Sequence, residues 1–152
     1  MEFVPPPDEI EQGLAELETH LRDELAACAH IERSSLSDGR ISMVSITPKN
    51  PSALGVSWME MHHEIILMAG HEGGRWELGR SQRDVDFVQD VVWSVVAGRA
   101  REVFAPKRSH VQITLASGKV VGETGRDGCL TMVAPIPGWR RFGRKVQYSR
   151  YQ

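Results

Sequence analysis

The stretch DEIEQGLAELETHLRDELAACAHI, residues 8–31, decides the first part of the fold. Its apolar residues recur at steps of three or four, the spacing that places side chains on one face of an α-helix. These residues are Ile10, Leu14, Leu17, Leu21, Leu25, Cys28 and Ile31. Asp8, followed three residues later by Glu11, fits an acidic variant of the capping box at a helix start. We therefore predict an amphipathic helix that begins near Asp8 and ends before the turn-forming residues 34–39.

A second helix is predicted in the middle of the chain. Ser81, followed three residues later by Asp84, has the pattern of a helix start, and Gly98 fits the position just after a helix end. Between them, valines recur at helical spacing: Val85, Val88, Val92, Val95 and Val96. Valine favours strands, but the length of the segment favours a helix. We expect a central helix that is mostly buried.

Short apolar runs predict β-strands between and after the two helices. We predict strands at residues 40–47, at 54–69 with a break near His62, at 75–78, at 111–121 as a hairpin turning at Ser117-Gly118, and at two edges, 129–134 and 146–151. Strands that follow one another in this way usually pair antiparallel, with the helices on one face. The predicted fold class is α+β: a mainly antiparallel sheet with an N-terminal amphipathic helix and one central helix packed on it. A single domain is expected over residues 1–152, with residues 1–7 as an extended, proline-rich lead-in.

The composition favours a folded protein outside the membrane. Of 152 residues, 41% are hydrophobic and 25% are charged, close to the average for globular domains. Cys28 and Cys129 lie far apart, without the spacing of a zinc site, so structural thiols are expected. Residues 1–7 lack the pattern of a signal peptide, and no run approaches the roughly 20 apolar residues that span a bilayer. We expect a cytoplasmic protein without a membrane partner.

The formal net charge of −2 hides an uneven distribution along the chain. Residues 1–38 contain ten acidic and two basic residues, whereas the remainder contains ten acidic and sixteen basic residues. Such an asymmetry can steer a charged partner, or it can reflect two faces that attract each other within the fold. Both interpretations remain open from the sequence.

The motifs of metal and nucleotide sites are incomplete in this chain. His63-Glu64 resembles the start of a HExxH metal site, but Leu67 stands where the second histidine should be. The glycines of residues 118–128 match neither the P-loop nor the dinucleotide pattern and are typical of turns. Asp84 and Asp86 are ordinary partners for the positive end of a helix dipole. We expect neither a metal nor another cofactor.

Acid–base catalysis is the third-ranked function that the sequence suggests. The candidate groups are Glu102, His110, Glu123 and Asp127. His110 precedes the turn at residues 117–118 and Glu123 follows it, so a His/Glu pair could form across the hairpin. The chain has no GxSxG elbow, the motif that would indicate a serine nucleophile. We therefore assign no catalytic residue and rank an enzyme below two binding functions.

The C-terminal segment, residues 139–151, interleaves basic and aromatic residues. Its basic candidates for contacting phosphate are Arg140, Arg141, Arg144 and Lys145. Bases that contact phosphate and rings that stack are what single-stranded nucleic acids require. Charges along an exposed edge strand, which discourage pairing with other chains, give the same pattern. A nucleic-acid-binding module is the alternative function.

A resemblance bears on the first-ranked function. Residues 84–99, 113–118, 123–125 and 137–139 resemble segments of small uncharacterised bacterial proteins. In its size and α+β pattern the chain is also similar to the immunity proteins of bacterial toxin systems. That resemblance implies a protein-binding function in which a preformed surface covers the active site of a cognate toxin. No functional position is carried over from these families.

The acidic outer face of the first helix is the surface that we predict for such a partner. Its candidate residues are Glu9, Glu16, Asp23 and Glu24. An acidic surface suits a basic nuclease toxin, because carboxylates imitate the charge of phosphates. The expected partner is a cognate protein, with nucleic acid as the alternative.

Overall fold

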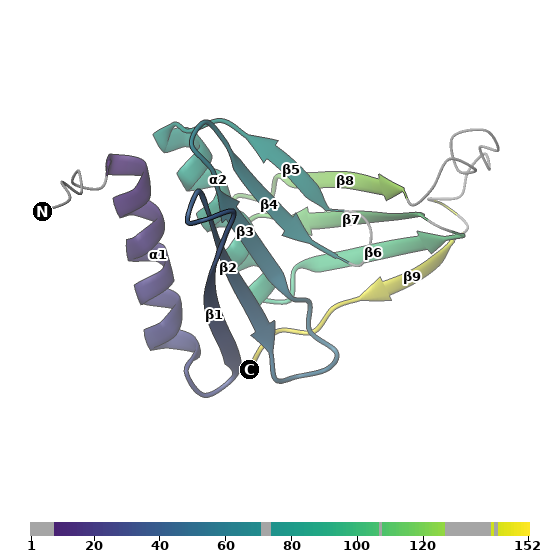
Figure 1. The fold of residues 1–152 in the computed structure, drawn as a ribbon. Coiled ribbons are helices and arrows are strands. Elements are labelled where there is room, and N and C mark those ends of the chain that lie inside the picture. Colours follow the sequence, from purple (N-terminus) through teal and green to yellow (C-terminus); the bar gives the residue numbers. More distant parts are fainter. Residues whose placement is uncertain (1–7, 71–73, 107, 127–140, 142) are drawn as a thin grey trace, which may run out of the picture.

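A computed structural model describes residues 8–70, 74–106, 108–126, 141 and 143–152 of the chain (Figure 1). Within these residues it contains two helices and nine strands in two antiparallel sheets. The predicted fold class is thereby confirmed: the protein is α+β, with an N-terminal helix, a central helix and mainly antiparallel strands. The division of the strands between two sheets was not predicted.

The first part of the chain forms one helix and a five-stranded sheet. The elements are α1 (Glu9–Leu25), β1 (Ala29–Leu36), β2 (Ile41–Pro48), β3 (Val56–Glu60), β4 (Ile65–Ala69) and β5 (Arg75–Leu78). The strands follow one another in the order β1-β2-β3-β4-β5, and each is antiparallel to the next. Short connections allow this meander, because antiparallel neighbours need only a turn between them.

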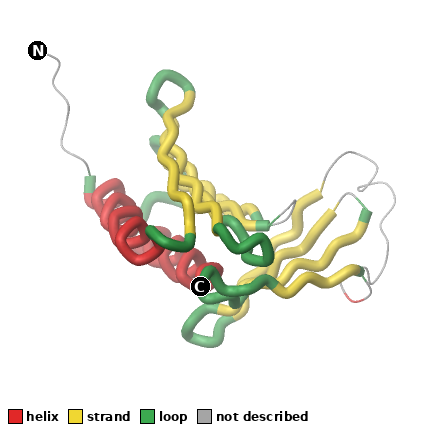
Figure 2. Tube along the Cα trace, turned by 90° about the horizontal axis from the view of Figure 1, so that it is seen from below, coloured by secondary structure: helices red, strands yellow, loops and turns green. Residues whose placement is uncertain are grey.

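The second part forms the central helix and a four-stranded sheet. The elements are α2 (Gln82–Val96), β6 (Ala100–Ala105), β7 (Arg108–Thr114), β8 (Val120–Arg126) and β9 (Arg144–Gln147). The strand order is β8-β7-β6-β9, so β9 is an edge strand beside β6. Figure 2 shows the two helices side by side, with the four-stranded sheet extending away from the five-stranded one.

The apolar faces of both helices meet in the core. Leu14, Leu17, Leu21 and Leu25 of α1 are buried, as is the valine face of α2. Burying a leucine side chain contributes roughly 1.5–3 kcal/mol, so this stripe fixes α1 firmly on the fold. Gly13 lets the two helices approach closely, since a Cβ atom there would lie 3.2 Å from Cγ1 of Val85.

The face of the five-stranded sheet that looks toward α1 changes from apolar to polar along the strands. Strand register places Ile31, Ile46 and Val56 in one row across β1, β2 and β3. Two rows farther along, the corresponding positions are Ser35, Ser42 and Glu60. Because alternate residues share a face, these rows belong to the same side of the sheet. The polar end lies beside the N-terminal half of α1.

The first helix is shorter than predicted. It ends at Leu25, and residues 29–36 form β1, which pairs with β2 from Ala29↔Pro48 to Leu36↔Ile41. Ile31 continued the helical spacing of the stripe, but it is also an inward position of the strand. The prediction was wrong because pairing along the whole of β1 outweighs a local pattern that suits both structures.

Two strand predictions are also corrected. Residues 54–69 do not form one broken strand but the hairpin β3–β4, which turns through residues 61–64. Strand β6 was not predicted, because its charged residues hide the alternation of a strand. The predicted strand at 129–134 lies outside the described residues, and the one at 146–151 is observed as β9, which begins at Arg144 and ends at Gln147.

The remaining element predictions are confirmed. Strands β2 and β5, the hairpin β7–β8 and the helix α2 lie where the sequence placed them. The capping box at Ser81 and Asp84 is present, with each side chain bonded to the backbone N–H of the other residue. Within the part of the chain that the structure describes, neither helix has the length and hydropathy needed to cross a membrane.

Candidate functional site

The start of α1 is held to the sheet by Asp8. One of its carboxylate oxygens, Oδ1, accepts a hydrogen bond of 2.7 Å from the backbone N–H of Glu11, which caps the helix. Arg80 donates from Nη2 to both carboxylate oxygens, at 3.0 and 2.8 Å, and from Nη1 to the carbonyl of Met61. The backbone bond and Arg80 lower the pKa of Asp8. One carboxylate thus caps α1 and fastens it to the segment before α2.

Glu18 lies inside the apolar stripe of α1, where an acid needs partners. Arg22 donates from Nε and Nη2 to Oε1 at 3.1 and 2.8 Å, and Arg33 of β1 donates from Nε and Nη2 to Oε2 at 2.8 and 2.5 Å. Both guanidinium groups therefore bind through two nitrogens. Burial alone would raise the pKa of Glu18, but the hydrogen bonds and charges of these arginines outweigh it and lower that pKa.

Glu60, at the end of β3, is buried with much weaker compensation. Only 10% of its side chain is exposed, and Nη1 of Arg33 lies 3.3 Å from Oε2. Among the described residues, nothing donates a hydrogen bond to its Oε1. Burial raises the pKa of Glu60, and Glu11 adds to this effect, while Arg33 and Arg80 oppose it. The nearby arginine therefore neutralises the charge of Glu60 less completely than Arg22 and Arg33 neutralise the charge of Glu18.

These groups surround a groove of about 1110 Å³ between α1 and the polar end of the five-stranded sheet, which we call the α1–β3 groove. Its lining residues are Asp8, Glu11, Ala15, Glu18, Thr19, Arg22, Arg33, Gly39, Arg40, Ser42, Glu60, Met61, His62 and Arg80. None of them was predicted as a site residue. One signal was present in the sequence: Glu18 follows Leu14 by four residues and precedes Leu21 by three, so it falls within the stripe.

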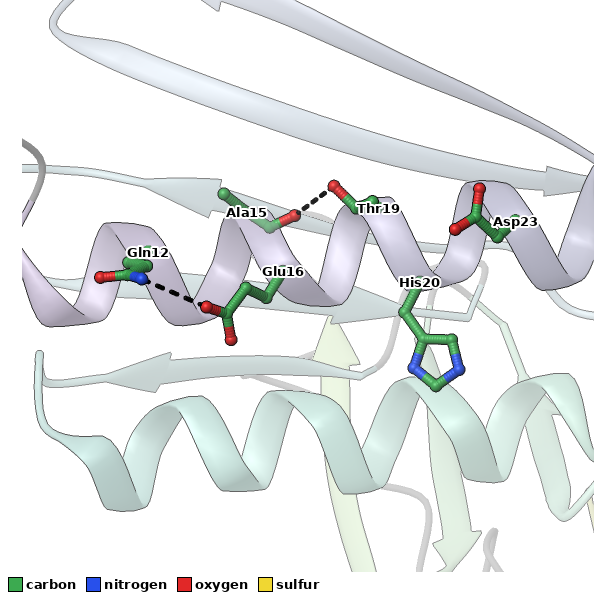
Figure 3. A pocket seen from close by; sticks show the side chains of 6 residues that line it. All are labelled: Gln12, Ala15, Glu16, Thr19, His20 and Asp23. Carbon is green, nitrogen blue, oxygen red and sulfur yellow. Dashed lines mark hydrogen bonds between the residues drawn. The ribbon is translucent and has the colours of Figure 1, made fainter.

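The predicted partner-binding acids lie outside this groove, on the solvent-exposed surface of α1. Glu9, Glu16, Asp23 and Glu24 are all exposed. Glu16 and Asp23 line a shallow hollow of about 430 Å³, together with Gln12, Ala15, Thr19 and His20. Figure 3 shows these six side chains along α1. The structure therefore brings two of the four predicted residues to one surface depression.

The contacts of these outer acids are few. Gln12 donates to Oε1 of Glu16 at 3.3 Å, and Glu24 lies 3.7 Å from Nε2 of His20. The ring of His20 packs edge-on against Trp93 of α2, with 5.2 Å between ring centroids. Within the described part of the chain, Glu9, Glu16 and Asp23 take part in no ion pair.

The suggested His/Glu pair does not form in the β7–β8 hairpin. His110 pairs in register with Thr124, whereas Glu123 pairs with Val111. Neighbouring residues of a strand point to opposite faces, so His110 and Glu123 lie on different sides of the sheet. His110 is buried, and a Cβ atom at Gly122 would lie only 3.0 Å from its Nε2. The sequence allowed this pair because hairpin position alone does not fix the face.

The other groups considered for chemistry are also dispersed. Glu102 of β6 is fully buried and accepts a 2.7 Å hydrogen bond from the hydroxyl of Tyr148, and Asp127 lies outside the described residues. His62 and His63 lie in the turn of the β3–β4 hairpin, and their ring centroids are 4.3 Å apart. In the described ranges, no three histidine, cysteine or acidic residues gather in a way that could hold a metal ion.

The basic C-terminal segment is partly committed to the fold. Arg144 and Lys145 are exposed on the edge strand β9, and the guanidinium carbon of Arg144 lies 4.7 Å from the centroid of the Phe104 ring. Arg141 is exposed as well, whereas Arg140 lies outside the described residues. This arrangement fits the decorated edge strand that the sequence offered as the other interpretation.

Two of the aromatic residues expected to stack on bases are used within the protein. The hydroxyl of Tyr148 donates to Glu102, and that of Tyr151 donates to the carbonyl of Leu54 at 2.6 Å. Tyr151 is buried, and burial raises the pKa of both phenols. Neither hydroxyl is positioned to contact a nucleic acid, and the ring of Tyr151 is covered.

Neither a protein-family model nor a curated protein matches this chain. Helix α1 shows a clear asymmetry among the described elements. The carboxylate of Glu18 binds two arginines, whereas those of Glu16 and Asp23 take part in no ion pair with a described residue.

Proposed function

We propose that the protein binds a basic partner protein through the solvent-facing side of α1, and that it acts as an immunity protein covering the active site of a cognate toxin. The observation that supports this proposal is the division of carboxylates on α1. Glu18, facing the sheet, is held by two arginines, whereas Glu16 and Asp23, facing solvent, line a hollow and have no ion-pair partner among the described residues.

The outer acids form a regular row. Glu9, Glu16 and Asp23 follow one another at intervals of seven residues, so their side chains lie on one side of the helix about 10 Å apart along its axis. A row of carboxylates without internal partners attracts a basic surface and accelerates its association. Basic surfaces are typical of proteins that bind nucleic-acid phosphates, which is why a nuclease toxin is the partner class that we favour.

The helix is also rigid enough to serve as a preformed surface. Its leucine stripe is buried, its first turn is capped by Asp8, and Glu18 ties its middle to β1. A surface that is ordered before binding avoids the entropic cost of becoming ordered in the complex. Occlusion of an active site by such a surface requires no chemistry from the protein itself.

The experiment begins with affinity capture from the native cell, using the full chain, with and without nuclease treatment. The captured protein is then purified, and its association rate is measured by surface plasmon resonance at low and high salt. Replacing Glu16 and Asp23 together by lysine should slow association about tenfold or more at low salt, with a smaller effect at high salt. The purified partner should lose its toxic activity when the wild-type chain is added in equal amount.

A matched control separates the role of this surface from that of net charge. Glu32 of β1 and Glu77 of β5 alternate with inward-facing residues, so they lie on the face of the sheet away from α1. Replacing both by lysine changes the net charge equally and should leave association close to the wild-type rate. Equal slowing in both double variants would contradict the proposed surface. Captured material that disappears with nuclease would favour the nucleic-acid alternative through Arg140, Arg141, Arg144 and Lys145.

A further inference from the structure

The α1–β3 groove contains a buried carboxylate that the fold leaves incompletely paired. Glu60 lines the groove, nine-tenths of its side chain is buried, and its Oε1 receives no hydrogen bond from any described residue. Oε1 is not one of the described buried atoms that lack a partner, so it stays open to the groove, but the side chain as a whole is poorly solvated, which raises the free-energy cost of its charge. A cation that reaches Oε1 through the groove would reduce that cost.

The guanidinium groups in the groove are already engaged. Arg33 shares its charge between Glu18, at 2.5 and 2.8 Å, and Glu60, at 3.3 Å. Arg80 is bound to Asp8 and to a backbone carbonyl, and Arg22 is bound to Glu18. Glu60 therefore receives only a minor share of one cation.

The remaining charges of the lining favour a cation near Glu60 over an anion. Glu11 adds a second carboxylate to the surroundings of Glu60. Arg40 also lines the groove, but it is an exposed residue of the β1–β2 turn, so water can solvate its guanidinium. Burial thus decides between the two: the carboxylate has the stronger need for a partner.

We propose that the α1–β3 groove receives one basic side chain of the partner protein, and that its guanidinium or ammonium group binds Glu60 with support from Glu11. This inference rests on the proposed function, because it names the group by which the same partner is anchored beside α1. A basic side chain inserted into a partly desolvated pocket is the usual form of an interface hot spot. The outer acids attract the partner, and Glu60 fixes its position.

The dimensions and chemistry of the groove suit an arginine. Its volume of about 1110 Å³ accommodates a long side chain together with bridging water. Met61 and Ala15 offer apolar surface for the methylene stem, while the cationic head reaches Glu60. Ser42, the register partner of Glu60 on β2, provides a hydroxyl oxygen that can accept a further hydrogen bond from the guanidinium.

The test uses small probes on the isotope-labelled full chain, followed by two-dimensional NMR. N-acetyl-arginine amide should shift the backbone signals of Ser42, Glu60 and Met61 in a saturable manner. N-acetyl-citrulline amide, which has the same shape without the charge, should bind at least tenfold more weakly. Inorganic phosphate serves as the anionic probe and should leave these signals unchanged.

Two variants define the site. Glu60→Gln keeps the size of the side chain and should weaken binding of the arginine probe about tenfold, as expected for loss of one charge-assisted pair. Glu32→Gln, on the face of the five-stranded sheet away from α1, is the matched control and should leave the affinity unchanged. Circular dichroism and the spectrum of the unliganded variants verify that both remain folded.

The outcomes separate this inference from the proposed function. Equal binding of arginine and citrulline probes, or undiminished binding to Glu60→Gln, would overturn the inference. Phosphate shifts centred on Arg40 and Arg22, without an effect of the arginine probe, would overturn it in favour of an anion site. Arginine binding at Glu60, with partner association unaffected by lysine at Glu16 and Asp23, would sustain the groove and refute the proposed surface.

Discussion

Glu16 and Glu18 are two residues apart on α1 and belong to different regions of the molecule. Glu18 faces the sheet, is 12% exposed in its side chain and binds two arginines, whereas Glu16 faces solvent and accepts one hydrogen bond from Gln12. The residue type is identical, so position relative to the leucine stripe decides the role. A carboxylate inside the stripe becomes part of the fold, and one outside it stays available for a partner.

Removing the charge of Glu18 is expected to change the stability of the fold more than removing the charge of any other carboxylate compared with it below. Glu18→Gln deprives Arg22 and Arg33 of their shared carboxylate and should lower the free energy of unfolding by about 2 kcal/mol, less than for a fully buried pair because both arginines are partly exposed. Urea unfolding at pH 7 measures the change. Glu16→Gln, the matched control, should stay within about 0.5 kcal/mol of the wild type. Equal effects of the two substitutions would remove the distinction between the sides of α1.

Lowering the pH should reduce the difference in free energy of unfolding between the wild type and Glu18→Gln. The pKa of Glu18 is lowered in the fold from its ordinary value of 4.5, so its stabilising effect is complete above pH 4.5 and is lost as the pH falls through the folded pKa. The difference between the two proteins in urea unfolding should therefore be constant from pH 7 to pH 4.5 and narrow below that. A gap that persists unchanged to pH 2.5 would show that the ion pairs do not cause it.

The cap of α1 is expected to contribute less. Asp8→Ala removes both the acceptor for the backbone N–H of Glu11 and the partner of Arg80, and should cost about 1 kcal/mol. Asp8→Asn keeps a capping oxygen and loses only the charge, which is 57% exposed, so it should cost less than half as much. Thermal and urea unfolding of the two variants measure the difference. Equal losses would assign the whole effect to Arg80.

Removing the charge of Glu60 should change the free energy of unfolding least, and in the opposite direction to removing the charge of Glu18. Burial and Glu11 raise the pKa of Glu60, so its ionised form opposes folding at pH 7 and this penalty disappears as the pH falls from the folded pKa to 4.5. Glu60→Gln should therefore change stability at pH 7 by no more than about 0.5 kcal/mol, without net loss. A large loss in urea unfolding would indicate that Glu60 is a structural partner of Arg33, as Glu18 is.

Local pattern predicted much of this fold because the signals were local. The spacing of leucines located α1, Ser81 and Asp84 marked the start of α2, and alternation identified the β7–β8 hairpin. The same reasoning failed at β1, whose identity depends on pairing with β2. It also failed at β6, where Glu102 occupies a buried position and accepts a bond from Tyr148, 46 residues away.

Local sequence pattern could not predict the α1–β3 groove either, because its residues are far apart in the sequence. Arg33 reaches Glu60 across 27 residues of sequence, and Arg80 reaches Asp8 across 72. Only the packing of α1 against the sheet brings these charges together. At the C-terminus, a basic and aromatic pattern suggested nucleic-acid binding, but Tyr151 packs in the core, which no composition could reveal.

The hydrogen bonds of residues 148–151 have a consequence for the timing of folding during synthesis. The backbone N–H of Tyr148 donates to Ala100, and Tyr151 donates from its N–H to Val96 and from its hydroxyl to Leu54. These bonds join α2, β6 and the segment before β3, which the ribosome completes some 50 to 100 residues earlier. Contacts of such long sequence separation form late. The junction between the five-stranded sheet and α2 therefore lacks these hydrogen bonds until residue 151 has emerged from the ribosome.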